Sequence, residues 1–134
     1  MLVLNPEKVT FAGQAWDGVE SIAIDRLAHR LVQEWSDAGP QMVWADVPEQ
    51  RVRIALVQRL DSGSMQSPLP GTTGLLRFEA ARSGSDAGRV SIEAEVVVGD
   101  VRHEVTRKGG LRSMVLWALS ADGVTDPVSV GDAA

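Results

Sequence analysis

The chain has 134 residues, a formal net charge of −5 and a pI near 4.9. Its Lys and Arg residues are scattered, which argues against a module that grips nucleic acid through phosphates. Cysteine is absent, so disulfides and thiolate metal sites are excluded, and no window approaches the roughly 18 to 20 apolar residues that a membrane span requires.

The first quarter of the chain predicts two strands followed by a helix. Residues 8–12 and 19–24 show short strand patterns. From Asp25 onward, apolar side chains recur at spacings of three and four, which predicts a helix over 25–36 that stops before Gly39-Pro40. An extended strand is the alternative, because several side chains here share parity: Leu27, His29, Leu31 and Trp35.

Further strands are predicted through the middle and the end of the chain. Residues 42–47 and 51–60 flank Pro48-Glu49-Gln50, which indicates a second hairpin. Strands are also expected over 75–81 and 128–130. Without a repeat or a boundary, residues 1–134 form one domain, and no signal peptide is evident at the N-terminus.

Residues 61–73 form a long polar loop that contains two Pro and two Gly. Loops of this length inside a compact domain tend to be functional or mobile. Its apolar points are Met65 and Leu69, which we expect to be exposed on an isolated subunit and to contact a neighbouring one.

The stretch 89–119 predicts an antiparallel meander. Apolar and polar residues alternate over 90–98, and Gly99-Asp100 resembles a two-residue hairpin link, because Gly tolerates the positive φ of a tight turn. A second turn around Lys108-Gly109-Gly110 returns a third strand over 111–119.

This meander has a register that creates an acidic face. If Gly99-Asp100 are the loop residues, Glu95 lies directly opposite Glu104, and Glu93 shares their face. Directly opposed carboxylates repel one another. Three explanations stay open: the register differs, the face meets basic groups, or it is meant to be negative.

Catalytic and metal sites are weakly indicated. His29 and His103 are too few for most His-based metal sites, and the acidic cluster suits a solvated or interface face better than acid–base catalysis. Residues 122–126 resemble a calcium loop but lack its later ligands. We therefore predict that the protein is not an enzyme and that it uses no cofactor or metal.

Self-association is the positive expectation. Residues 114–119 are apolar on both strand faces, as in a central strand or one covered by another molecule. Met114 and Leu116 are the residues expected to contact a second subunit. Together with the loop tips, this pattern favours an oligomer.

These features together resemble a tail tube protein of a long-tailed bacteriophage, or of a prophage or phage-like particle. The resemblance covers most of the chain in pattern and rests on 19–37 with Gly39-Pro40, the 51–60 strand, the 61–73 loop and the 101–119 return. It implies a mainly β fold, an antiparallel β-sandwich or barrel with one α-helix, here over 25–36.

The resemblance also implies a function. Such subunits form hexameric rings that stack into a hollow virion tube for DNA passage and ejection, assembled in the bacterial host cytoplasm. Partners would be further copies, with sheath or other tail proteins as additional candidates and DNA only as passing cargo. Glu93, Glu95 and Glu104 would then face an acidic lumen. The alternatives are a tail terminator, baseplate ring or decoration protein, or a small β-barrel binding module.

Overall fold

The computed structural model describes residues 6–60, 68–81 and 89–132, and every regular element in these ranges is a β-strand. The strands are β1 (Glu7–Phe11), β2 (Gln14–Ala15), β3 (Val19–Trp35), β4 (Met42–Leu60), β5 (Thr73–Ala80), β6 (Val90–Thr106), β7 (Gly109–Ala118) and β8 (Val128–Asp132). All pairings are antiparallel, in the order β2-β1-β5-β6-β7-β4-β3, with β8 beside β6.

The sheet encloses one hydrophobic core that draws on seven of its strands. Side chains on β4, β5, β6 and β7 alternate between buried and more exposed, as expected for a sheet with one face on a core. Fully buried members include Ile54, Leu56, Leu76, Val96 and Leu116. Burying one such side chain contributes roughly 1.5–3 kcal/mol to folding. The strands and their antiparallel pairings confirm the predicted mainly β, antiparallel class.

The helix predicted over 25–36 is wrong, because this segment belongs to β3 and pairs with β4 from Val19 to Trp35. The described part of the chain contains no helix. Register shifts after Ala28, after Arg30 and before Trp35 interrupt the strand. The shift after Ala28 inserts His29 as an extra residue of β3, whereas the other two insert the extra residue in β4. An inserted residue shifts the alternation of its own strand, so the apolar spacing of β3 departs from two and imitates that of a helix.

The hairpin predicted around Pro48-Glu49-Gln50 is also wrong, because β4 runs unbroken through it. Proline cannot donate to a sheet ladder and is tolerated on a free strand edge. Pairing of β4 with β7 begins only at Arg53, so the edge at Pro48 has no β7 partner.

The turn predicted at Gly99-Asp100 lies within β6, which continues to Thr106. Val98 pairs with Leu116 and Asp100 with Val115, so Gly99 is the extra residue of a bulge. A Cβ at Gly99 would lie 2.7 Å from Nε1 of Trp117. Glycine therefore allows a close ring contact here, and the chain reverses instead at residues 107–108.

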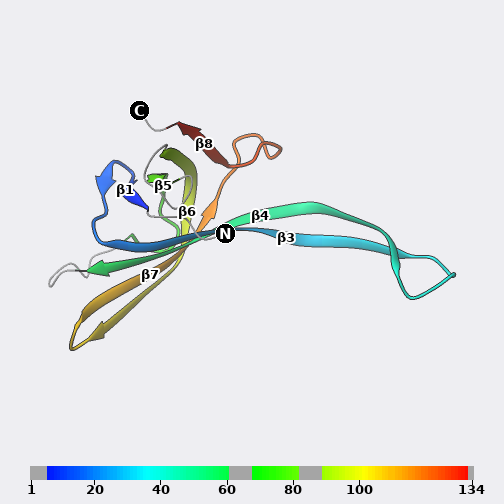
Figure 1. Ribbon diagram of the computed structural model, residues 1–134, viewed down its shortest axis with the longest axis horizontal. Helices are drawn as coiled ribbons and strands as arrows, with labels where there is room; N and C mark the ends of the chain where they lie inside the picture. The colour runs from blue at the N-terminus through cyan, green and yellow to red at the C-terminus, as the bar shows by residue number, and fades with distance from the viewer. Residues whose placement is uncertain (1–5, 61–67, 82–88, 133–134) are drawn as a thin grey trace.

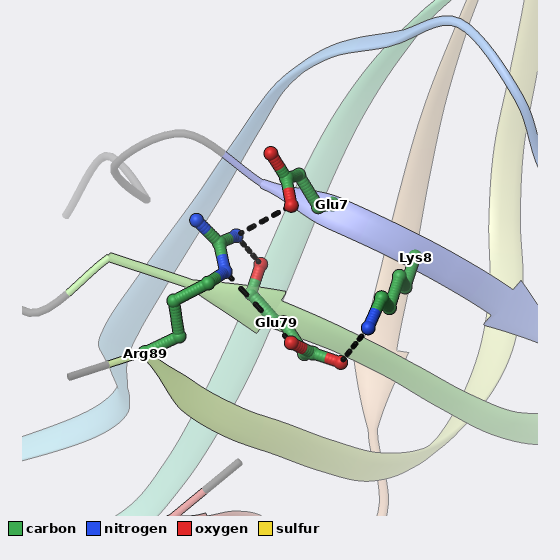
Figure 2. A network of polar contacts seen from close by, with 4 residues as sticks. All are labelled: Glu7, Lys8, Glu79 and Arg89. Carbon is green, nitrogen blue, oxygen red and sulfur yellow. Dashed lines mark hydrogen bonds and ion pairs between the residues drawn. The ribbon is translucent and has the colours of Figure 1, made fainter. Parts of the chain in front are cut away.

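A polar network joins one end of the sheet (Figure 2). Arg89, just before β6, donates from Nη2 to the Glu79 carbonyl at 3.1 Å, and the same nitrogen lies 3.7 Å from a carboxylate oxygen of Glu7. Lys8 Nζ lies 3.4 Å from the Glu79 carboxylate. The network links β1, β5 and the start of β6 by charge as well as by backbone pairing.

Candidate assembly surfaces

The outer half of the β3–β4 hairpin extends away from the rest of the sheet (Figure 1). We call residues 28–50 the arm. Because β4 pairs with β7 only between Arg53 and Leu60, the strands of the arm pair only with each other among residues 6–60, 68–81 and 89–132. From the Ala28–Gln50 pair to the Trp35–Met42 pair the ribbon extends roughly 25 Å, at about 3.3 Å per residue.

The end of the arm exposes large apolar side chains. Their exposed fractions are 47% for Leu31, 54% for Trp35, 47% for Met42, 62% for Val43 and 47% for Trp44. Leu31 and Trp35 share one face by strand parity, and Met42 joins them as the partner of Trp35. An isolated two-stranded ribbon is at best marginally stable in water, and contiguous apolar exposure of this kind marks an interaction surface.

The opposite face of the arm is acidic. Residues 31–47, which we call the arm tip, contain three carboxylates and no Lys, Arg or His, a net charge of −3. Glu34 pairs with Trp44 and Val32 with Asp46, which puts both carboxylates and Trp44 on one face. Asp37 lies in the turn. No ion pair to these three carboxylates occurs among residues 6–60, 68–81 and 89–132.

Charged contacts lie at the base of the arm. Arg53 of β4 donates to its cross-strand partner Asp25 of β3 at 3.2 Å, and Arg26 donates to Asp126, in the loop before β8, at 2.8 Å. The Arg51 guanidinium stacks 4.8 Å from the ring centroid of Trp117, a geometry in which ring and cation attract. Arg26, Arg51 and Asp126 also line a hollow of about 480 Å³ between the arm base and residues 118–127.

The loop between β7 and β8 is ordered by one carboxylate. Asp122 accepts hydrogen bonds from the Val124 and Thr125 amides at 2.8 and 2.7 Å and from the Thr125 hydroxyl at 2.6 Å. The Thr125 hydroxyl and these amides hold the pKa of Asp122 well below its usual range. The carboxylate oxygens are thus engaged within their own turn, and the described residues contain no group of acidic or His side chains that could hold a metal.

The β6–β7 hairpin ends in a basic tip at the other end of the molecule from the arm (Figure 1). We call residues 101–110 the β6–β7 tip. It carries Arg102, Arg107 and Lys108 against the single carboxylate of Glu104, a net charge of +2. All four are exposed, and the tip also exposes 68% of Val105. None of its three cations has an ion-pair partner in the described ranges.

A buried polar pair lies between β4 and β7, beside a second hollow of about 770 Å³. Arg112 donates to the side-chain oxygen of Gln58, whose amide donates to the Asp17 carbonyl at 2.7 Å. The Arg112 guanidinium also lies 5.1 Å from the Trp16 ring centroid. Burial lowers the pKa of Arg112. The lining of this hollow includes Leu60 and Pro68, which border the segment 61–67 that the structure does not describe.

The predicted acidic cluster is not brought together by a hairpin. Glu93 forms an ion pair with Arg77 at 3.0 Å, and exposed Glu95 pairs across strands with Leu75. Glu104 is exposed and pairs with Leu111. Nine residues of one continuous strand, roughly 30 Å, separate Glu95 from Glu104. Their mutual repulsion is therefore not a feature of this fold, and a lumen-facing role for the three glutamates stays a prediction.

The predicted inter-subunit residues fall into three groups. Met114 and Leu116 are 2% and 0% exposed and belong to the core, which accounts for their apolar character without a second subunit. Leu69 is 73% exposed. Met65 lies outside the described residues, together with most of the predicted 61–73 loop.

The two histidines show no metal-site geometry. His29 is exposed on the arm and His103 is half-buried on β6. In the described ranges, no helix is long and apolar enough to cross a membrane.

The arm is the feature that sequence reasoning missed. Its signal was present as two long extended segments, 19–35 and 42–60, around the Gly39-Pro40 turn. Bulges and Pro48 interrupt the alternating pattern of these two segments, so each segment looked like two shorter elements in the sequence.

Comparison with known proteins does not assign the chain to a family. Neither a protein-family model nor a curated protein matches this sequence.

Proposed function

We propose that this protein is a structural subunit that assembles with copies of itself, and that its specific role is that of a tail tube subunit, stacked as rings around a channel for DNA. The arm is the observation that carries the proposal. It projects from the sheet and exposes two Trp and three other large apolar side chains near its end, and within the described part of the chain its strands pair only with each other.

The exposed apolar side chains of the arm support association, because five large ones lie near its end. A stable interface needs about 800 Å² from each partner, and a ring requires two such contacts for each subunit.

The resemblance to tail tube proteins supplies the specific role. It implies six copies in a ring and a long loop, here 61–73, that reaches a neighbouring subunit. We assign a second contact of this kind to the arm, because the arm projects from the sheet. The implied outer helix is missing from the described residues. A net charge of −5 suits passage of DNA without adhesion, because like charges repel over a Debye length.

Light scattering and negative-stain microscopy of the purified chain test the proposal. The matched variant replaces residues 31–48 by Asn-Gly, which joins the paired residues Arg30 and Glu49 by a two-residue turn. We expect rings or tubes from the unmodified chain and a folded monomer from the variant. A strict monomer of the unmodified chain at high concentration, without rings in micrographs, contradicts the proposal.

A further inference from the structure

The two projecting hairpins of the chain have opposite charge. The arm tip carries −3 and the β6–β7 tip carries +2, and the charged groups on both are solvent-exposed. They lie at opposite ends of the long axis of the molecule (Figure 1). A contact between them therefore joins different surfaces of two copies. Repeated from copy to copy it builds a closed ring or an open filament, whereas two copies that exchange both contacts form a two-fold dimer.

We propose that the arm tip of one copy docks on the β6–β7 tip of the next copy. This inference rests on the proposed function and names the two surfaces that make the contact. Glu34, Asp37 and Asp46 on the arm tip meet Arg102, Arg107 and Lys108 on the neighbour.

The chemistry of both surfaces suits this pairing. Charge complementarity steers association and fixes the register of two partners. Trp44 shares the acidic face of the arm tip, so an incoming Arg can stack on its ring while bonding to the adjacent carboxylates. The chain already uses this geometry internally, where Arg51 lies over Trp117. Exposed Val105 offers an apolar contact beside the cations.

A charge-swap experiment tests the docking. The first variant is E34K/D37K/D46K, with a basic arm tip, and the second is R102E/R107E/K108E, with an acidic β6–β7 tip. All six positions are exposed, and circular dichroism checks that each variant keeps its strand content. Like charges across a contact cost several kcal/mol, so each variant alone should assemble roughly a hundredfold more weakly.

Mixing the two variants in equal amounts should restore assembly, because each arm tip again meets a tip of opposite charge. Assembly by both single variants at the concentration that serves the unmodified chain overturns the docking and leaves the proposed function standing. If neither variant assembles alone and their mixture does not assemble either, the proposed docking is also overturned. A monomeric unmodified chain overturns the proposed function, and the docking with it.

Cysteine cross-linking gives a second readout. The natural chain has no cysteine, so S36C on the arm tip and K108C on the β6–β7 tip introduce unique thiols. On oxidation of an equal mixture, the S36C–K108C product should exceed both homodimers at least tenfold. A statistical distribution of the three products contradicts the docking.

Discussion

At the scale of single residues, glycines and carboxylates perform different tasks from those their local sequence suggests. Gly99-Asp100 has the composition of a hairpin turn, yet the chain passes through it within β6. The space above Gly99 is filled by the indole of Trp117, with the Val115 carbonyl 3.2 Å from a Cβ built at Gly99. This position is thus constrained by packing against β7.

A side chain at Gly99 should destabilise the fold. In Gly99→Ala the added methyl group meets Trp117 at 2.7 and 2.9 Å, and such overpacking costs about 1–3 kcal/mol. Urea unfolding measures the loss. Gly131→Ala is the control, because a Cβ there has no atom within 4 Å, and its effect should stay within about 0.5 kcal/mol. Equal effects of both substitutions would show that the Trp117 contact is unimportant.

The Asp122 turn should make stability depend on pH. Because its hydrogen bonds lower the folded-state pKa of Asp122, its contribution is fully present above the unfolded pKa near 4 and is lost as pH falls through the lower folded value. In Asp122→Asn, the fall in Tm between pH 6 and pH 2 should be smaller than in the natural chain. Asp100→Asn, on the exposed side of β6, should leave that fall unchanged.

At the scale of elements, the β3–β4 hairpin combines two functions in one pair of strands. Its inner part contributes core residues such as Ile24 and Ile54, whereas its outer part is exposed on both faces. The two parts differ in what stabilises them: burial against β7 and the core in one, and cross-strand contacts alone in the other. Changes in the arm should therefore affect association without affecting folding.

Polar substitution of the apolar face of the arm tests this separation. In W35S/M42S, two apolar side chains that lie directly opposite each other across the hairpin are replaced by serine. The free energy of unfolding of the monomer should change by less than about 0.5 kcal/mol, while light scattering should show that assembly is lost.

The control for the arm substitution is V130S on β8, where a similarly exposed apolar side chain is replaced; it should still assemble. Leu116→Ala marks the opposite extreme, since truncating this buried core residue should cost about 2–5 kcal/mol. Assembly by W35S/M42S equal to that of the natural chain contradicts the role of this face.

At the scale of the whole molecule, the chain is a curled sheet with two projections, one acidic and one basic. Projections of this kind expose surface without adding to the hydrophobic core of an isolated monomer. The projections should therefore be locally less stable than the core part of the sheet, since segments with few buried contacts open at low free-energy cost.

Hydrogen exchange should show the division directly. In dilute monomer, the amides of residues 28–50 should exchange far faster than those of the β6–β7 ladder near Val96 and Leu116. Both of these residues are buried in the core, and each lies in a strand that is paired there. In the assembled state, protection of the arm should rise at least tenfold, because its bonds can then open only after dissociation. Equal protection of the arm in both states would indicate that assembly does not involve it.

The sequence by itself determined the β class and most strand positions, because alternation of buried and exposed side chains is a local property of a strand. It also determined the turn near Lys108, where chain reversal depends on neighbouring residues. Tertiary structure decided three other features: the continuity of β6 through Gly99, the continuity of β4 through Pro48, and the extended form of 25–35. Each depends on a partner strand distant in sequence, which supplies hydrogen bonds or close contacts that no local pattern encodes. The opposite placement of the acidic and basic tips likewise follows only from the order of strands in the sheet.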